Sequence, residues 1–520
     1  MVKTKILWVD DEVELLKPHI IFLENKDFLI QTCNNGSDAV EMIRNENFEA
    51  VLLDENMPGL NGIETLTLMR DLNTSIPIIM ITKSEEENIM DDAIGNKISD
   101  YLIKPVNPKQ ILLSLKKNLN DKKIISDKTV SSYQQEFRNI SIKLSDINTI
   151  KEWTNMYLNL VSWEVKLEEN SNDTMMEILV SQKNEANRLF AKFIENNYKQ
   201  WVNDKSSSPL LSNFVIKDRL VKELSDSKPT LFLVIDNLRY DQWRVLEPLI
   251  NEYYNKTHEE AYFSILPTTT QYARNSLFSG LMPSEIAKIY PNYWKNDPEE
   301  GGKNLYEEQL LKLNLKKLGY SGISCEYNKI TNLKNGQKLS NNLKDKLKND
   351  LTVVVYNFVD MLSHSKTEME IIKELASNDK GYRSLTLSWF KNSPLFEIIK
   401  KGSEYGFKLV ITTDHGTINV KNPSKIIGNR ETSQNLRYKT GRSLTYNQKE
   451  VVSFHNPNDI LLPSISLNSS YVFAKENTYL VYPNNYNYYV NFFRDTYQHG
   501  GISLEEIIIP YVVLMPRIKK

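Results

Sequence analysis

A carboxylate and an imidazole stand side by side where an apolar run ends, at Asp414 and His415 in "KLVITTDHG". Two other apolar runs also end in aspartate, "LFLVIDN" and "VVVYNFVD", and further imidazoles occur in "DMLSH" and "YQHGG". Two aspartates and an imidazole can hold a first-row metal ion, and the chain supplies two such sets. The spacing of Asp360 and His364 places both on one face if a helix begins there. The candidate ligands are Asp236, Asp360, His364, Asp414, His415 and His499.

A hydroxyl-rich turn, "LPTTTQYARNS", precedes a predicted helix whose N-terminus could bind an oxyanion. Any of Thr268 to Thr270 could supply a nucleophilic hydroxyl, although hydroxyls at such turns more often cap the helix. Arg274 and Asn275 follow one turn later, where they could reach a phosphoryl group or lie on a surface face. His455, in "SFHNPND", could also contact phosphate, but a polar loop histidine is the better interpretation of that pattern.

These residues need a scaffold that brings distant strand ends together. From Lys5 to about Asn120, short apolar runs alternate with helix-period stretches, which indicates a parallel sheet with crossover helices. Residues 131–203 contain no glycine or proline and repeat apolar residues at three-to-four spacing, which predicts long helices. Buried-type strands return after Lys228. In an open α/β sheet, ligands bind outside the carboxyl ends of the strands, where the three terminal aspartates would converge.

Composition narrows the class of protein. Residues 1–120 carry 20 acidic and 12 basic side chains, a net charge of −8, and the remaining 400 residues carry +6. That weak positive balance tolerates an anionic substrate but does not indicate DNA wrapping. Two distant cysteines, Cys33 and Cys325, encode neither a disulfide framework nor a thiolate zinc site. With no long apolar run and no signal-peptide pattern, we expect a soluble, cytoplasmic protein without membrane insertion.

The order of "VDDE", "LLDENMPG", "MITKS" and "DYLIKP" resembles the receiver domain of two-component response regulators. The resemblance implies that Asp54 accepts a phosphoryl group from a cognate sensor histidine kinase. It also implies a Mg²⁺ ion that neutralises the incoming charge, with a fixed set of oxygen ligands. Those ligands would be Asp10, Asp11, Asp54 and the backbone carbonyl of Asn56.

Three further residues match the switch positions of that family. Lys104 would place a positive charge on the phosphoryl oxygens, and the hydroxyl of Thr82 would move toward them. Tyr101 stands where the family carries its switch aromatic. Phosphorylation would therefore remodel the face near "DYLIKP" and favour a homodimer.

The rear motifs, in the order Asp, P-T-x-T, D-x-x-x-H, D-H-G and His, resemble the PglZ branch of the alkaline phosphatase superfamily over residues 228–515. The resemblance implies two zinc ions per chain and a nucleophilic threonine, which Thr270 matches as the second threonine of P-T-x-T. One zinc would be bound by Asp236, Thr270, Asp414 and His415, and the other by Asp360, His364 and His499. Thr268 and Thr269 remain competing nucleophiles.

We therefore expect an α/β multidomain protein with a CheY-like doubly wound receiver at residues 1–122, a helical middle domain at 123–205 and an alkaline-phosphatase-like α/β domain at 206–520. This layout resembles response regulators of type IX secretion. It implies a zinc-dependent phosphodiesterase acting on oligonucleotides, including cyclic ones. The alternative is a phosphorylation-switched module, with a mainly structural metal site, that binds a sigma factor or a secretion motor component. Direct promoter binding is the weakest option, because no helix-turn-helix region is evident.

Overall fold

The structure, a computed structural model, describes residues 3–72, 76–83, 98–169, 173–224, 228–357, 378–429, 433–466 and 468–517, together with Val359, Glu374 and Ala376. The chain forms two compact units, Met1–Gln134 and Gln135–Lys520. Most of the helical segment expected at residues 123–205 lies in the second unit. The three predicted domain boundaries stay a prediction.

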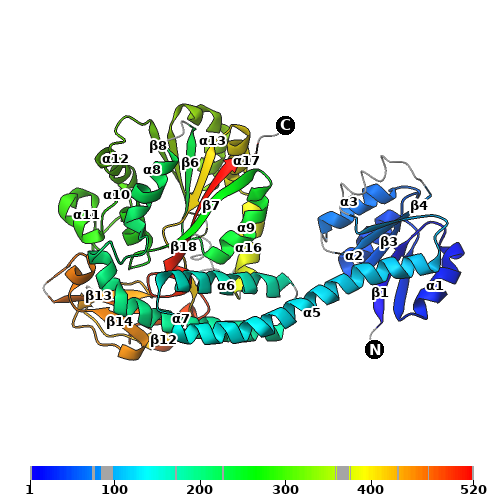
Figure 1. Ribbon diagram of the computed structural model, residues 1–520, viewed down its shortest axis with the longest axis horizontal. Helices are drawn as coiled ribbons and strands as arrows, with labels where there is room; N and C mark the ends of the chain where they lie inside the picture. Colours follow the sequence, from blue (N-terminus) through cyan, green and yellow to red (C-terminus); the bar gives the residue numbers. More distant parts are fainter. Residues whose placement is uncertain are drawn as a thin grey trace. The chain divides into compact units, whose positions relative to one another are not determined.

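The first unit contains a five-stranded parallel sheet in the order β2-β1-β3-β4-β5 (Figure 1). Successive side chains of a strand point to opposite faces, so the sheet builds a core on each side. Leu7 and Leu53 belong to one core, whereas Trp8 and Leu52 belong to the other. The strands are β1 (Thr4–Val9), β2 (Phe28–Cys33), β3 (Ala50–Asp54), β4 (Ile78–Thr82) and β5 (Asp100–Ile103). Helices α1 (Lys17–Glu24), α2 (Gly36–Asn45) and α3 (Gly62–Leu72) belong to the same unit.

Three long helices follow, as the run without glycine or proline predicts: α5 (Pro108–Asp146), α6 (Ile150–Glu169) and α7 (Asp173–Asn203). The division between the two units falls within α5. Trp153 on α6 packs against Phe190 and Phe193 on α7, with ring centroids 5.3 and 5.9 Å away. Trp153 and Tyr157 are buried, so these aromatic side chains belong to the core of the helical segment.

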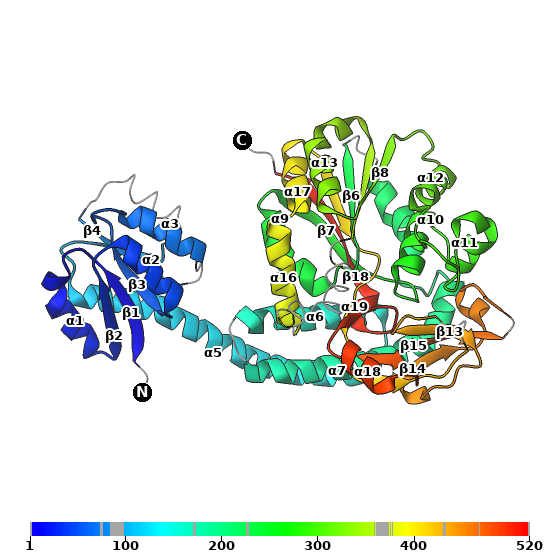
Figure 2. The same cartoon turned by 180° about the vertical axis from the view of Figure 1, so that it is seen from behind.

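The second unit is built on a six-stranded sheet in the order β7-β18-β10-β6-β9-β8. The four strands from β10 to β8 are parallel, and β18 is antiparallel to both of its neighbours. Figures 1 and 2 show α10 and α12 on one side of this sheet and α9 and α16 on the other. The strands are β6 (Thr230–Ile235), β7 (Tyr254–Phe263), β8 (Cys325–Ile330), β9 (Leu351–Tyr356), β10 (Lys408–Thr412) and β18 (Ile508–Pro516). The main helices are α9 (Tyr240–Asn251), α10 (Asn275–Ser279), α12 (Glu307–Lys317), α13 (Leu333–Asn341), α16 (Asp379–Lys391) and α17 (Pro394–Glu404).

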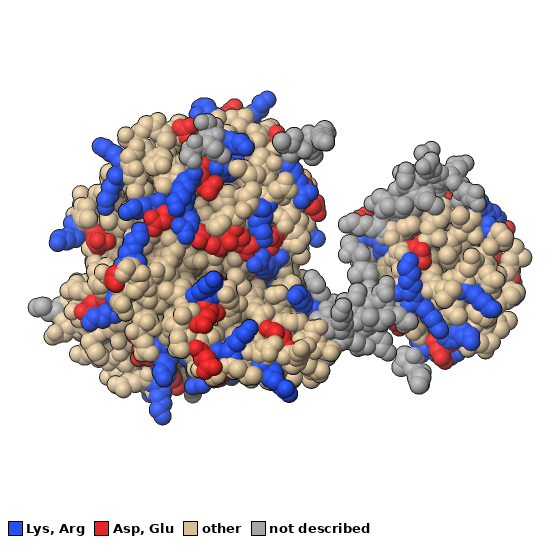
Figure 3. All heavy atoms as spheres, viewed as in Figure 1, with Lys and Arg blue, Asp and Glu red and all other residues tan. Residues whose placement is uncertain are grey.

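Smaller sheets stand between β10 and β18 in the sequence. The largest has the order β13-β15-β14, from Tyr438–Arg442, Ser469–Ala474 and Val451–Phe454. Strand β11 (Ile418–Asn419) pairs with β17 (Tyr497–Gln498), which brings the segment after His415 alongside the segment before His499. On the face of the second unit seen in Figure 3, cationic and acidic side chains are intermixed. Within the described residues, no helix is long and apolar enough to cross a bilayer.

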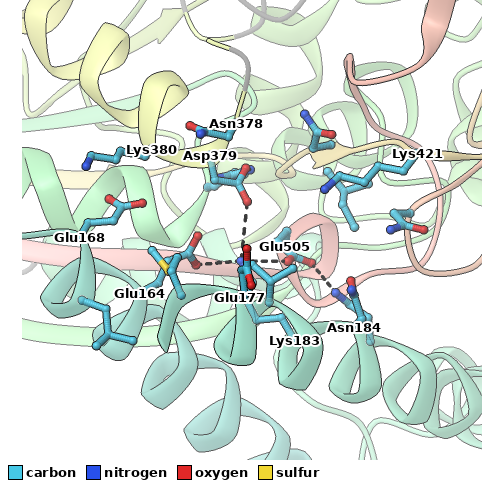
Figure 4. A pocket seen from close by; sticks show the side chains of 18 residues that line it. Glu164, Glu168, Glu177, Lys183, Asn184, Asn378, Asp379, Lys380, Lys421 and Glu505 are labelled. Atoms are coloured by element: carbon cyan, nitrogen blue, oxygen red, sulfur yellow. Dashed lines mark hydrogen bonds and ion pairs between the residues drawn. The ribbon is translucent and has the colours of Figure 1, made fainter. Parts of the chain in front are cut away.

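A buried ion network docks α6 and α7 onto the rest of the second unit (Figure 4). Nζ of Lys183 on α7 lies 2.7 Å from Oε2 of Glu164 on α6, 3.4 Å from Oε1 of Glu505 and 3.8 Å from Oδ2 of Asp379. Arg383 on α16 pairs with Glu164 at 2.9 Å. A cavity of about 430 Å³ opens beside these residues. Charges are tolerated in such an interior only when they are paired, so the network fixes how the helices dock.

We expect Lys183→Met to destabilise the second unit by about 3 kcal/mol, because it leaves buried carboxylates with less compensating charge. Urea unfolding followed by tryptophan fluorescence measures the change. Lys192→Met, at an exposed position of the same helix, is the matched control and should change the unfolding free energy little. Equal midpoints for the two variants would contradict a stabilising role for the network.

Candidate functional site

An acidic cluster lies at the carboxyl ends of β1 and β3 in the first unit. Asp10 follows β1 and Asp54 ends β3, and the two strands pair in parallel, so their ends lie side by side. Carboxylate oxygens of Asp10, Asp11 and Asp54 lie within 4.8 Å of one another. Nζ of Lys104 is 2.9 Å from Oδ2 of Asp10 and 2.9 Å from Oδ2 of Asp54. The cluster offers the oxygen ligands that Mg²⁺ prefers. The Asn56 carbonyl lies in the loop after β3.

The electrostatics of this cluster favour an added cation. Burial and the charge of Asp10 raise the pKa of Asp54, against the lowering effect of Lys104. Burial alone would lower the pKa of Lys104, but its two carboxylate partners raise it above its usual value. Three carboxylates share one ammonium group, so the cluster carries a net negative charge when all three are ionised. Thr82 ends β4, where its hydroxyl donates to Oε2 of Glu55 at 3.1 Å, and it also hydrogen-bonds Tyr101 on β5.

A second cluster lies at the carboxyl ends of β6 and β10. Thr412 pairs with Val234, so two residues later Asp414 falls beside Asp236. Ligand atoms of Asp236, Asp414 and His415 lie within 4.8 Å of one another, and all three residues are buried. A Cβ at position 416 would meet the carbonyl oxygen of Glu505 at 1.9 Å, which explains the glycine after the histidine.

Thr270 contributes its hydroxyl to this second cluster. Oγ1 of Thr270 lies 3.3 Å from Oδ1 of Asp236 and 3.1 Å from Nε2 of His415. The hydroxyl of Thr268 instead donates to the carbonyl of Gly501 and accepts from the amide of Gly500, each at 3.0 Å. Oγ1 of Thr269 is buried and has no hydrogen-bond partner among the described residues. Of the three hydroxyls, that of Thr270 is the one placed against the carboxylate and the imidazole.

His499 joins the same cluster through its ring, which stacks on that of His415 with centroids 4.4 Å apart. Gly500 follows with a φ of +120°, and a Cβ there would meet Tyr438 and Thr269 at 2.8 and 3.0 Å. This crowding holds the loop that contains His499 and Gly500, the histidine loop, against the turn of Thr268 to Thr270, the threonine turn. Asp360 and His364 lie outside the described residues, so of the second predicted zinc ligand set only His499 has a described position.

The three residues expected to bind substrate take different positions. Arg274 is buried, and its guanidinium lies between Asp236 and Glu307. The amide of Asn275 donates to the carbonyls of Gln271 and Lys303 and so supports the local fold. His455 is exposed in the loop after β14, in line with the polar-loop interpretation. Sequence reasoning missed Glu307, since an acidic residue in the first turn of a helix is commonplace.

The residues of the second cluster fit a metal ion. Oδ1 of Asp414 accepts from the backbone amides of Asn237 and His415 at 3.3 and 3.1 Å. Its Oδ2 is buried and has no hydrogen-bond partner among the described residues. Burial opposes ionisation of Asp414, but the charges of His415 and Arg274 outweigh it and lower the pKa. An ionised, buried carboxylate oxygen beside an imidazole is a donor set that suits zinc.

We expect Thr268→Val to lower the free energy of unfolding by about 1–3 kcal/mol, because it removes both hydrogen bonds of a buried hydroxyl. Thr269→Val, whose hydroxyl makes no hydrogen bond among the described residues, should cost less. Thermal and urea unfolding of the two variants, compared with the unchanged protein, measure the difference. Equal stability of both variants would contradict a role for Thr268 in holding the histidine loop.

Three family models match consecutive parts of the chain. The response regulator receiver domain matches residues 6–116, the PorX response regulator linker domain matches 123–202, and the BREX system PglZ alkaline phosphatase-like domain matches 216–514. The PglZ model spans more than half of the 520 residues. The expected fold class is confirmed: a receiver, a helical middle region and an alkaline-phosphatase-like domain.

Several response regulators are similar to part of this chain. The chain is 32% identical over 166 residues to the transcriptional regulatory protein CpxR homolog of Haemophilus influenzae, covering 32% of this chain and 70% of that protein. It is 34% identical over 114 residues to ResD of Bacillus subtilis, covering 22% of this chain and 47% of ResD. The chain therefore spans less than half of ResD. A receiver domain from Methanospirillum hungatei is 26% identical, with a TM-score of 0.22, over 23% of this chain and 95% of that one.

Proposed function

Because the chain belongs to the PglZ family and carries a receiver and a PorX-type linker ahead of that domain, we propose that it is a response regulator whose output is zinc-dependent phosphoester hydrolysis. The observation that carries this proposal is the position of the Thr270 hydroxyl, against both Asp236 and His415 at adjacent strand ends. Two zinc ions per chain are proposed, one held by Asp236, Thr270, Asp414 and His415, and one by Asp360, His364 and His499.

The chain's own residues give the reaction its geometry. Oγ1 of Thr270 loses its proton to solvent and bonds to phosphorus as the ester P–O bond breaks, and the leaving oxygen takes up a proton from water. A second water then hydrolyses the phosphothreonine and restores the threonine hydroxyl. Bound zinc would lower the pKa of the attacking hydroxyl and offset the charge of the phosphoryl oxygens. Asp236 and His415 orient the hydroxyl, and the burial of Asp414 keeps water away from its carboxylate. The proposed substrates are phosphodiesters in linear or cyclic oligonucleotides, whose negative charge the weak positive balance of residues 121–520 tolerates.

Control of this output is proposed to come from the receiver. A sensor histidine kinase would supply the phosphoryl group to Asp54, with Mg²⁺ held by Asp10, Asp11 and Asp54 beside Lys104. The contact between Thr82 and Tyr101 is the element that would transmit the change. The PorX-type layout extends the proposal to type IX secretion, with a sigma factor and a secretion motor component as partners.

We expect Thr270→Val to lower turnover of bis-nitrophenyl phosphate by several orders of magnitude, because only the attacking oxygen is removed. Thr269→Val is the control and should keep most of the activity. Zinc content, measured by mass spectrometry after purification without chelator, should be two per chain in the unchanged protein. Full activity of Thr270→Val would leave direct attack by water as the mechanism, and a protein without zinc would contradict the metal assignment.

We expect beryllofluoride with Mg²⁺ to shift the protein to a dimer, because the mimic pulls Thr82 and Tyr101 toward Asp54 and remodels the nearby face. Sedimentation velocity measures the shift. Asp54→Ala provides the control, since it cannot hold the mimic. An unchanged mass for the unaltered protein, or the same shift in both proteins, would remove phosphorylation as the cause of dimerisation.

A further inference from the structure

Helix α12 begins with a carboxylate that is buried behind the proposed metal centre. The side chain of Glu307 is only 1% exposed, and its Oε1 lies 2.6 Å from Nε of Arg274. Its Oε2 accepts from the hydroxyl of Tyr327 at 2.5 Å and from Nζ of Lys329 at 2.9 Å. Both of those donors belong to β8 at the edge of the sheet. Each oxygen of Glu307 is therefore held by a charged or hydroxyl donor.

Arg274 is held between this glutamate and the metal centre. Its side chain is 1% exposed, and Nη1 lies 2.7 Å from Oδ2 of Asp236. The same nitrogen is 3.7 Å from Oδ2 of Asp414. The pair with Asp236 is an electrostatic contact, without the geometry of a hydrogen bond at Nη1. Because Nε is bound to Glu307, the planar guanidinium has one orientation at Asp236.

This orientation decides which oxygen Asp236 offers to the centre. With Oδ2 paired to Arg274, Oδ1 of Asp236 faces Oγ1 of Thr270 at 3.3 Å and Nε2 of His415 at 3.9 Å. A rotation of the carboxylate would remove Oδ1 from that position. Groups that bind a ligand's second oxygen fix the ligand in this way, and their loss weakens metal binding.

Glu307 also limits the electrostatic attraction between Arg274 and the two carboxylates of the metal centre. Its negative charge offsets part of the guanidinium charge at a place away from Asp236 and Asp414. Without it, the buried positive charge would have, among the described residues, only those two carboxylates as partners and would compete with a metal cation for them. The same glutamate therefore orients the arginine and limits that competition.

We propose that Glu307 is a positioning residue for the metal centre, acting through Arg274 to present Oδ1 of Asp236 to the metal beside Thr270. The assignment of zinc rests on the proposed function. The buried arginine is thereby a support for the ligands, in contrast to the substrate contact that its place after the threonine turn suggested.

The test is the zinc affinity of Glu307→Gln, measured in the full chain by competition with a chromophoric chelator. We expect the dissociation constant to rise about tenfold or more, as is usual for groups that support metal ligands. Glu308→Gln is the matched control: Glu308 is the next residue of α12 and forms an ion pair with Lys312 on the surface. Its zinc affinity should equal that of the unchanged protein.

Kinetic measurements at saturating zinc distinguish a role in supporting the metal ligands from a direct contact with the substrate. If Glu307 and Arg274 support the ligands, excess zinc restores much of the turnover of Glu307→Gln and leaves its Michaelis constant unchanged. If Arg274 binds substrate, the Michaelis constant rises and excess zinc does not correct it, which overturns the proposal. Should Glu307→Gln fail to fold, Arg274→Lys keeps the charge but loses the fork, and its zinc affinity should fall likewise.

If Glu307→Gln, or Arg274→Lys in its place, binds zinc as tightly as the unchanged protein, the positioning role is overturned. The proposed hydrolase activity is not affected by that result. A chain that binds no zinc even before substitution is a different failure, because it overturns the metal centre of the proposed function and the positioning role with it. Circular dichroism and the unfolding midpoint verify that each variant compared is folded.

Discussion

Two carboxylates, Asp236 and Asp414, are buried side by side because β6 and β10 are adjacent and parallel. Like charges in an interior raise the free energy of the fold unless opposite charges or hydrogen bonds offset them. Several contacts of the site offset these charges. Arg274 pairs with Asp236, and two backbone amides donate hydrogen bonds to Asp414. The imidazole of His415 lies near both carboxylates. A cation bound here would offset the charge that remains, as the proposed chemistry requires.

The first unit meets the same constraint with other residues. Asp10 and Asp54 close adjacent parallel strands, and a single Lys104 lies 2.9 Å from each. Burial and the acidic neighbour Asp10 raise the pKa of Asp54, whereas in the second cluster the charges of His415 and Arg274 outweigh burial and lower the pKa of Asp414. In both units, the carboxyl ends of adjacent parallel strands gather carboxylates whose oxygens are suitable ligands for a divalent cation.

The helices α6 and α7 contact the loops that carry the second cluster. The buried network that contains Lys183 reaches Asp379, which also pairs with Arg239, three residues after Asp236. Oδ1 of Asp379 accepts from the hydroxyl of Tyr497 at 2.7 Å, two residues before His499. A shift of α7 would therefore act on the segments that hold the proposed ligands, because Asp379 contacts both Lys183 on α7 and Tyr497 near His499.

The sequence by itself determined the order of the strands' acidic ends, the helical middle region and the families that these motifs resemble. Those features depend on local periodicity, which is present in the chain before it folds. The pairing of Asp236 with Asp414 also followed, since neighbouring parallel strands end at one edge. The resemblance implied that His499 binds the other zinc with Asp360 and His364, and nothing local to "YQHGG" specifies that its ring stacks on that of His415.

Tertiary structure alone decided which of three consecutive threonines faces the carboxylate and the imidazole, because the choice depends on how the turn packs against Gly500 and Gly501. It also turned Arg274 inward, toward Glu307, a partner 33 residues later on another helix. No pattern of spacing encodes such a pair, since its geometry exists only once α12 and the threonine turn have packed together. Local sequence thus specified the types of residue at the site, and long-range packing specified their orientation.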